Sequence, residues 1–175
     1  HLQRSALTLK GLSFAPTGAI AAAATTSLPE TPGGERNWDY RYTWISDTVA
    51  NLWAFNTLRL DWEANDFFNF VADIADAEGG HLQLMYGVGG ERILTEKTLD
   101  HLSGYEGARP VRVGNGAYSQ RQHDVWGAIV RAIDLHTGGH RVEDRLWRIV
   151  QTQVECALEH WLEPDQGILE VRSGA

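Results

Sequence analysis

The chain has 175 residues, and 43% of them are hydrophobic, which is enough for one domain with a sizeable core. A formal net charge of −8 argues against nucleic acid and against anionic membranes as partners. No apolar run approaches the roughly 18 residues of a membrane-spanning helix, so we expect no membrane association. The lone cysteine, Cys156, excludes an internal disulfide and fits a reducing compartment, so we expect a cytoplasmic protein.

Apolar residues recur at helical spacing in five segments, which predicts five helices. Ser46 or Asp47 could cap the second of them. Almost nothing separates the second from the third, so we expect these two to form an antiparallel hairpin. Gly138 and Gly139 break the chain between the fourth and the fifth. The predicted helices cover residues 2–12, 46–60, 61–78, 120–136 and 141–161.

Three other segments are predicted to be extended or irregular. Residues 18–24 are small and apolar, which favours a short buried extended segment, and residues 82–87 alternate like a short strand or extended arm. Residues 87–118 contain seven glycines, and a loop of that length in a compact domain is usually functional. Short turns at one end of the helix pairs and long polar-aromatic loops at the other predict an all-α toroid with its site at the loop-rich end.

The segment from Asn37 to Asp47 is the richest in polar and aromatic side chains. Its eleven residues include four aromatics, two acids and one arginine. Aromatic faces suit the flat C–H face of a sugar ring, and carboxylates beside them can accept hydrogen bonds from its hydroxyls. A tightly packed loop would have the same composition, so the residues alone leave packing and binding evenly matched.

A second concentration of such residues lies between Trp161 and Arg172. Glu170 stands between apolar Leu169 and Val171, which disfavour the charged carboxylate and would suit a general acid. Arg172 would face the same side of an extended segment and would lower the pKa of Glu170. An ordinary salt bridge between Glu170 and Arg172 is the commoner outcome of this pattern.

A third concentration runs from Gly114 to Asp124, where the fourth helix is predicted to begin. Gln120 and Asp124 lie four residues apart, so one helix face would present an amide and a carboxylate, as hydroxyl recognition needs. The helix dipole explains Asp124 equally well. No His-X-X-X-His pair on a continuous helix, no Cys-X-X-Cys pair and no Gly-X-Ser-X-Gly motif occurs, so we expect neither a metal site nor a nucleophilic serine.

Taken together, these motifs resemble glycoside hydrolase family 15, which contains glucoamylases, glucodextranases and bacterial trehalases. Residues 33–44 resemble its GGxRNWDYRYxW signature, residues 84–115 are similar to its bacterial trehalase-like branch, and residues 163–172 resemble its EPDxGIWEVR element. The resemblance covers essentially the whole chain. It implies an (α/α)6 toroid, inverting hydrolysis of α-glucosidic bonds, a small carbohydrate substrate and no cofactor.

The resemblance also implies roles for individual residues. By position, Glu170 matches the general acid of the family. Tyr40, Trp44 and Asp47 would line the non-reducing glucose and bond its hydroxyls. Gln122, Asp124 and Arg172 would lie beside the site.

Three departures from the family pattern bear on activity. Ser46 stands where the family usually has an arginine, and losing such a charge-assisted bond costs about 1.5–3 kcal/mol. Leu169 replaces a tryptophan, and the general base of the family lies beyond the last residue. We therefore expect residues 1–175 to be the first part of the toroid, inactive alone, with an open apolar flank that promotes self-association into homo-oligomers or aggregates.

The function expected of the full-length protein is hydrolysis of α,α-trehalose to glucose. One alternative is a glucoamylase or glucodextranase that acts on α-glucan ends. A second is a degenerate, non-catalytic carbohydrate-binding member, to which the departures at Ser46 and Leu169 point.

Overall fold

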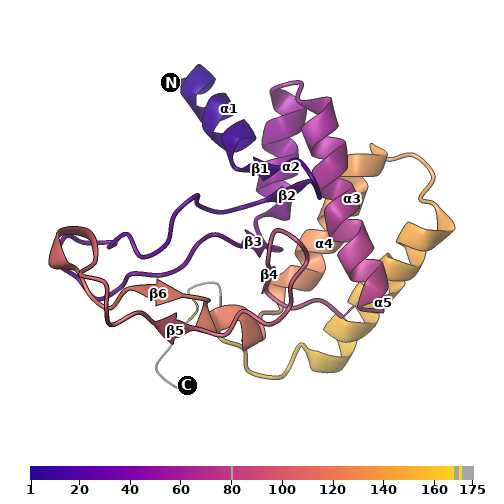
Figure 1. The fold of residues 1–175 in the computed structure, drawn as a ribbon. Helices are drawn as coiled ribbons and strands as arrows, with labels where there is room; N and C mark the ends of the chain where they lie inside the picture. Colours follow the sequence, from indigo (N-terminus) through magenta and orange to yellow (C-terminus); the bar gives the residue numbers. More distant parts are fainter. Residues whose placement is uncertain (80, 168–169, 171–175) are drawn as a thin grey trace.

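The computed structural model describes residues 1–79, 81–167 and 170 (Figure 1). Within them the protein is mostly helical, as predicted. Five α-helices are described: α1 (Leu2–Gly11), α2 (Thr48–Thr57), α3 (Asp61–Ala77), α4 (Asp124–Thr137) and α5 (Asp144–His160). Short strands form antiparallel pairs: β1 (Ser13–Phe14) with β2 (Ala19–Ile20), β3 (Thr43–Trp44) with β4 (Met85–Tyr86), and β5 (Lys97–Thr98) with β6 (Arg112–Val113). Two 3-10 turns, η1 (Tyr105–Gly107) and η2 (Gly116–Ser119), lie in the connection before α4.

The α2–α3 hairpin stands at the centre of the helical body (Figure 1). Residues 58–60 join the two helices, so the predicted hairpin is confirmed. Helix α4 packs against both α2 and α5. Two helical hairpins do not by themselves close a ring, so the toroid stays a prediction.

One face of α3 supplies much of the core, because its apolar residues recur three or four positions apart. Phe67 of this helix is fully buried, as are Phe55 of α2 and Tyr86 of β4. Both residues of β2 are also buried. The predictions of a short buried segment within 18–24 and of a strand within 82–87 are therefore confirmed.

Long connections form an arm beside the helices (Figure 1). Residues 22–27 run antiparallel to residues 38–42: the Ala23 N–H donates to the Tyr40 carbonyl at 2.8 Å, and the Ser27 N–H donates to the Trp38 carbonyl at 3.0 Å. The connection that carries β5 and β6 joins the same arm. The long segment predicted to be irregular therefore folds against the aromatic stretch.

Helix α4 begins at Asp124, and the prediction that it starts at Gln120 is wrong. The cause is a pairing with a distant segment. The Arg121 N–H donates to Gln166 Oε1 at 2.9 Å, and the Gln166 N–H donates to the Arg121 carbonyl at 3.1 Å. Gln120 is extended, so the helix face that was to present Gln120 with Asp124 does not exist.

Helix α5 likewise begins three residues later than predicted, at Asp144. The backbone of Glu143 is still extended, and left-handed Gly138 and Gly139 lie shortly before it. The glycine break therefore takes up residues that the periodicity had placed in the helix.

Candidate active site

A cavity of about 450 Å³ opens at the N-terminal ends of α2 and α4. It brings together six of the seven residues predicted for the site. The seventh, Arg172, lies outside the described residues, as do Leu169 and Val171. The lining consists of Ala22, Tyr40, Trp44, Ser46, Asp47, Gln122, Asp124 and Glu170.

Trp44 and Glu170 meet across this cavity. The indole Nε1–H of Trp44 donates to Glu170 Oε1 at 2.6 Å. Trp44 is 7% exposed and belongs to β3, so the pairing with β4 holds its backbone. The carboxyl therefore has one oxygen bound to a rigid donor, which restricts its direction within the cavity.

The backbone of Glu170 is itself unusual. Its φ of 50° lies in the left-handed region, which non-glycine residues seldom adopt. Its N–H donates to the Gly167 carbonyl at 3.1 Å, which closes a turn. Strained residues of this kind concentrate at functional sites.

Tyr40 and Trp44 form the aromatic wall of the cavity. Their ring centroids lie 5.8 Å apart at an interplanar angle of 46°. Burial and the nearby carboxylates of Glu30 and Glu170 raise the pKa of Tyr40, so its hydroxyl stays protonated. Two neutral aromatic faces set at an angle suit the apolar faces of a sugar ring.

Two acids stand side by side at helix starts. Asp47 is the N-cap residue of α2, without a side-chain capping bond, and Asp124 is the first residue of α4. Both are exposed to the cavity, yet partial desolvation, followed by the negative charge of Asp124, raises the pKa of Asp47. Among the described residues that line the cavity none is cationic, which fits Ser46 in place of the usual arginine.

Gln122 has a structural contact as well as a place in the cavity. It is 5% exposed, and its Nε2 donates to the Gly167 carbonyl at 2.8 Å. Asp165, which the sequence reasoning did not single out, accepts bonds from the His123 N–H at 2.9 Å and the Gly167 N–H at 3.0 Å. The start of α4 therefore holds the turn that leads to Glu170.

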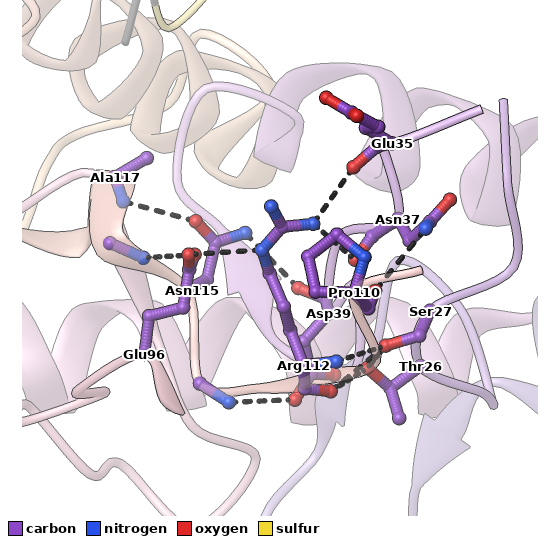
Figure 2. Close-up of polar contacts among 12 residues, drawn as sticks. Thr26, Ser27, Glu35, Asn37, Asp39, Glu96, Pro110, Arg112, Asn115 and Ala117 are labelled. Carbon is purple, nitrogen blue, oxygen red and sulfur yellow. Dashed lines mark hydrogen bonds and ion pairs between the residues drawn. The ribbon is translucent and has the colours of Figure 1, made fainter. Parts of the chain in front are cut away.

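Asp39 is the other residue that the sequence reasoning missed. It lies inside the aromatic stretch, is 1% exposed and does not line the cavity. Figure 2 shows it in a polar network that joins the two long connections of the arm. Only the burial of Asp39 distinguishes it from the polar residues around it, and the sequence pattern does not show that burial.

The chain matches the description "Glycosyl hydrolases family 15" over residues 1–175, and it belongs to that family. It is 60% identical to a trehalase of Mycolicibacterium smegmatis and 61% identical to a trehalase of Mycobacterium tuberculosis. Each alignment covers 98% of this chain and 26% of the relative. A trehalase of Thermoplasma volcanium is 42% identical over 98% of this chain and 27% of its own.

The chain thus spans about a quarter of the length of the curated relatives it matches. No solved structure matches it significantly.

None of the described helices is long and apolar enough to cross a bilayer. In the part of the chain that the structure describes, no three metal-binding side chains gather into a cluster. The expected cytoplasmic location stays a prediction.

Proposed function

We propose that the complete protein carrying this chain hydrolyses α,α-trehalose to glucose with inversion at the anomeric carbon. Residues 1–175 would be the first part of its (α/α)6 catalytic domain. Family membership and the names of the relatives support the reaction and the substrate. The observation that carries the proposal is the meeting of Glu170, Trp44 and the carboxylates of Asp47 and Asp124 in one cavity.

In this proposal Glu170 protonates the oxygen between the two sugars as the bond to it breaks. The carboxylate left behind accepts the Trp44 N–H in a charge-assisted bond, which is stronger than the neutral one. That gain favours proton transfer to the leaving sugar. Asp47 and Asp124 would accept hydrogen bonds from glucose hydroxyls while Tyr40 and Trp44 cover its apolar faces.

Inversion also needs a carboxylate that activates water on the opposite side of the ring. In inverting enzymes the two carboxyls stand roughly 6.5–9.5 Å apart, so that a water molecule fits between them and the sugar. Asp47 and Asp124 are assigned here to hydroxyl binding, and the base is assigned to the part of the protein beyond residue 175. Residues 1–175 alone would then have little activity, because each member of such a pair supplies about 10²–10⁴-fold.

Glu170→Gln in the complete protein tests this assignment. The amide keeps the shape of the side chain but has no proton to transfer, so kcat on trehalose should fall by about 10²–10⁴-fold. α-Glucosyl fluoride needs no proton on its leaving group, and its turnover should fall far less. Glu159→Gln, an acid 76% exposed on α5, is the matched control and should leave both rates unchanged.

Undiminished trehalose turnover by Glu170→Gln would remove Glu170 from its role. The substrate is tested separately, with the unmodified protein, on trehalose, maltose and dextran. Fast maltose turnover without trehalose turnover would place the protein with the glucoamylases instead.

A further inference from the structure

The aromatic wall is supported from two directions, because residues 37–42 form neither a helix nor a regular strand. Backbone bonds to residues 22–27 hold one side of this segment. The buried carboxylate of Asp39 holds the segment through side-chain contacts. Its Oδ1 accepts from Arg41 Nε at 2.8 Å and from the Arg41 N–H at 3.2 Å. Its Oδ2 accepts from Arg41 Nη2 at 2.8 Å, the Tyr42 hydroxyl at 3.0 Å and the Gly114 N–H at 3.0 Å.

These bonds outweigh the effect of desolvation on Asp39. Burial acts to raise the pKa of Asp39, but the donors from Arg41 and Tyr42 hold it below its usual value. The group therefore stays charged, and a charged acceptor holds its donors more tightly than a neutral one. Five donors on one carboxylate leave residues 39–42 little freedom.

Gly114 and Asn115 fasten Asp39 to the other connection. Asn115 is 1% exposed, and its Nδ2 donates to the Asp39 carbonyl at 3.1 Å while its Oδ1 accepts from the Ala117 N–H at 3.0 Å (Figure 2). Gly114 has a φ of 80°, and a Cβ there would lie 2.0 Å from the Thr95 carbonyl oxygen. Only glycine can therefore bring this N–H to Asp39.

Arg112 forms an outer tie in the same network. Its guanidinium lies 4.5 Å from the centre of the Trp38 ring. It also pairs with Glu96 at 3.2 Å and donates to the Glu35 carbonyl at 2.9 Å (Figure 2). The Ser27 hydroxyl donates to the Arg112 carbonyl at 2.9 Å. These contacts join the two connections to each other, and Arg112 does not line the cavity.

The Asp39 network encloses Tyr40 along the chain. Asp39 precedes Tyr40, and its side chain binds the two residues that follow Tyr40. The network therefore restrains the backbone on both sides of Tyr40. Trp44 comes two residues after Tyr42, and its indole holds Glu170. The pairing with β4 holds Trp44 from one side, and the Asp39 network holds the segment that leads into Trp44. Loss of the network would therefore loosen the wall and the carboxyl bound to it.

We propose that Asp39 is a positioning residue: through its bonds to Arg41, Tyr42 and Gly114 it sets the aromatic wall and, through Trp44, the direction of the Glu170 carboxyl. Asp39 does not line the cavity and is assigned no contact with substrate. The inference rests on the proposed role of Glu170 as the acid.

Asp39→Asn in the complete protein is the test, with trehalose and α-glucosyl fluoride compared side by side. An amide presents one N–H₂ group to donors, so the network cannot close as before. Displacing reacting groups by about 1 Å costs on the order of 10²-fold, which we expect for kcat on trehalose. Fluoride leaves without a proton, so the loss on α-glucosyl fluoride should be about tenfold and the ratio of the two rates should change about tenfold.

A purely structural role gives a different result. Partial unfolding lowers the concentration of active protein and reduces both rates equally, so a ratio within about threefold of the unmodified protein overturns the proposal. Glu78→Gln is the matched control, since Glu78 is also shielded and paired with an arginine, Arg92, but lies outside the network. It should leave the ratio unchanged.

Tyr42→Phe carries the same test if Asp39→Asn does not fold. This variant removes one donor from Asp39 and keeps the ring. The ratio of its rates on trehalose and α-glucosyl fluoride should change in the same direction by a smaller factor. An unchanged ratio overturns the proposal. Failure of the proposed function is distinguishable, because it appears as full trehalose turnover by Glu170→Gln.

Discussion

At the scale of single residues, the surroundings of Asp47 affect both the pKa of its carboxyl and the stability of the fold. Partial desolvation and the charge of Asp124 raise its pKa. A raised carboxyl pKa means that ionising the group costs more in the folded state than in the unfolded state. The protonated Asp47 carboxyl therefore contributes stability below the ordinary pKa of 3.8, and this contribution is lost as the pH rises through the pKa of the folded state. In the proposed site, Asp47 would lower stability and serve binding at once, a combination that is common where function needs a charged group.

We expect Asp47→Asn to raise the melting temperature at neutral pH by on the order of 1–3 °C, because the amide has no charge to desolvate. This advantage should shrink as the pH falls toward 3.8. The kcat/KM on trehalose should fall about 10–100-fold, because a neutral acceptor binds a hydroxyl more weakly. Calorimetry across this pH range and steady-state kinetics measure both effects.

The control for this variant is Asp61→Asn, at the first turn of α3. It also removes a charge at a helix start, but it should lower stability slightly through the helix dipole. A lower melting temperature for Asp47→Asn at neutral pH would contradict the claim that the charged Asp47 carboxylate destabilises the fold.

At the scale of elements, the turn at residues 163–167 connects α4 to the proposed acid. It has no regular structure of its own, so Asp165 holds it by accepting bonds from His123 and Gly167. The His123 bond lowers the pKa of Asp165 below its usual value, although desolvation acts against it. A lowered carboxyl pKa stabilises the fold above the unfolded value, and the contribution is lost as the pH falls through the folded value.

Asp165→Ala should therefore loosen the turn that leads to Glu170 while leaving the aromatic wall in place. We expect kcat on trehalose to fall about tenfold with KM changed by less than about threefold. Its melting temperature should be lower than that of the unmodified protein at neutral pH, and the difference should close as the pH falls below 3.8. Asp165→Asn keeps one acceptor oxygen and should recover part of kcat; a large rise in KM at constant kcat would show that the turn acts on binding.

At the scale of the whole molecule, α5 leaves an apolar stripe uncovered. The exposed residues recur at seven, eleven and fourteen positions from the first, which places them on one helix face. Contiguous exposed apolar residues on one face are typical of an interaction surface. In the proposed toroid the next helices would cover it. The stripe consists of Trp147, Val154, Leu158 and Trp161.

Residues 1–175 made alone should therefore self-associate in a concentration-dependent way, measured by light scattering after gel filtration. Replacing Trp147 and Leu158 with lysine should reduce the association, since charges on the stripe cannot be buried without cost. Leu7→Lys changes an equally exposed leucine on α1 and should not reduce it. A cooperatively melting monomer at all concentrations would contradict the prediction.

The sequence by itself determined the helices, the α2–α3 hairpin and the short buried strands. It also predicted a set of site residues, six of which line one cavity. Local periodicity carries this information, because an apolar stripe such as that of Phe67 and Val71 on α3 buries itself wherever a partner is available. Periodicity failed at Gln120, where the backbone bonds to Gln166 rather than entering the helix. Nothing within a few residues of Gln120 signals a partner so far along the chain.

Only the tertiary structure decided how the polar side chains are used. Trp44 and Glu170 are 126 positions apart, and Asp39 and Gly114 are 75 apart, so neither bond leaves a spacing to read. Asp47 and Asp124 affect each other only because α2 and α4 pack with their starts at one cavity. Hydrogen bonds and charge interactions depend on distance in space, and packing of the core sets that distance.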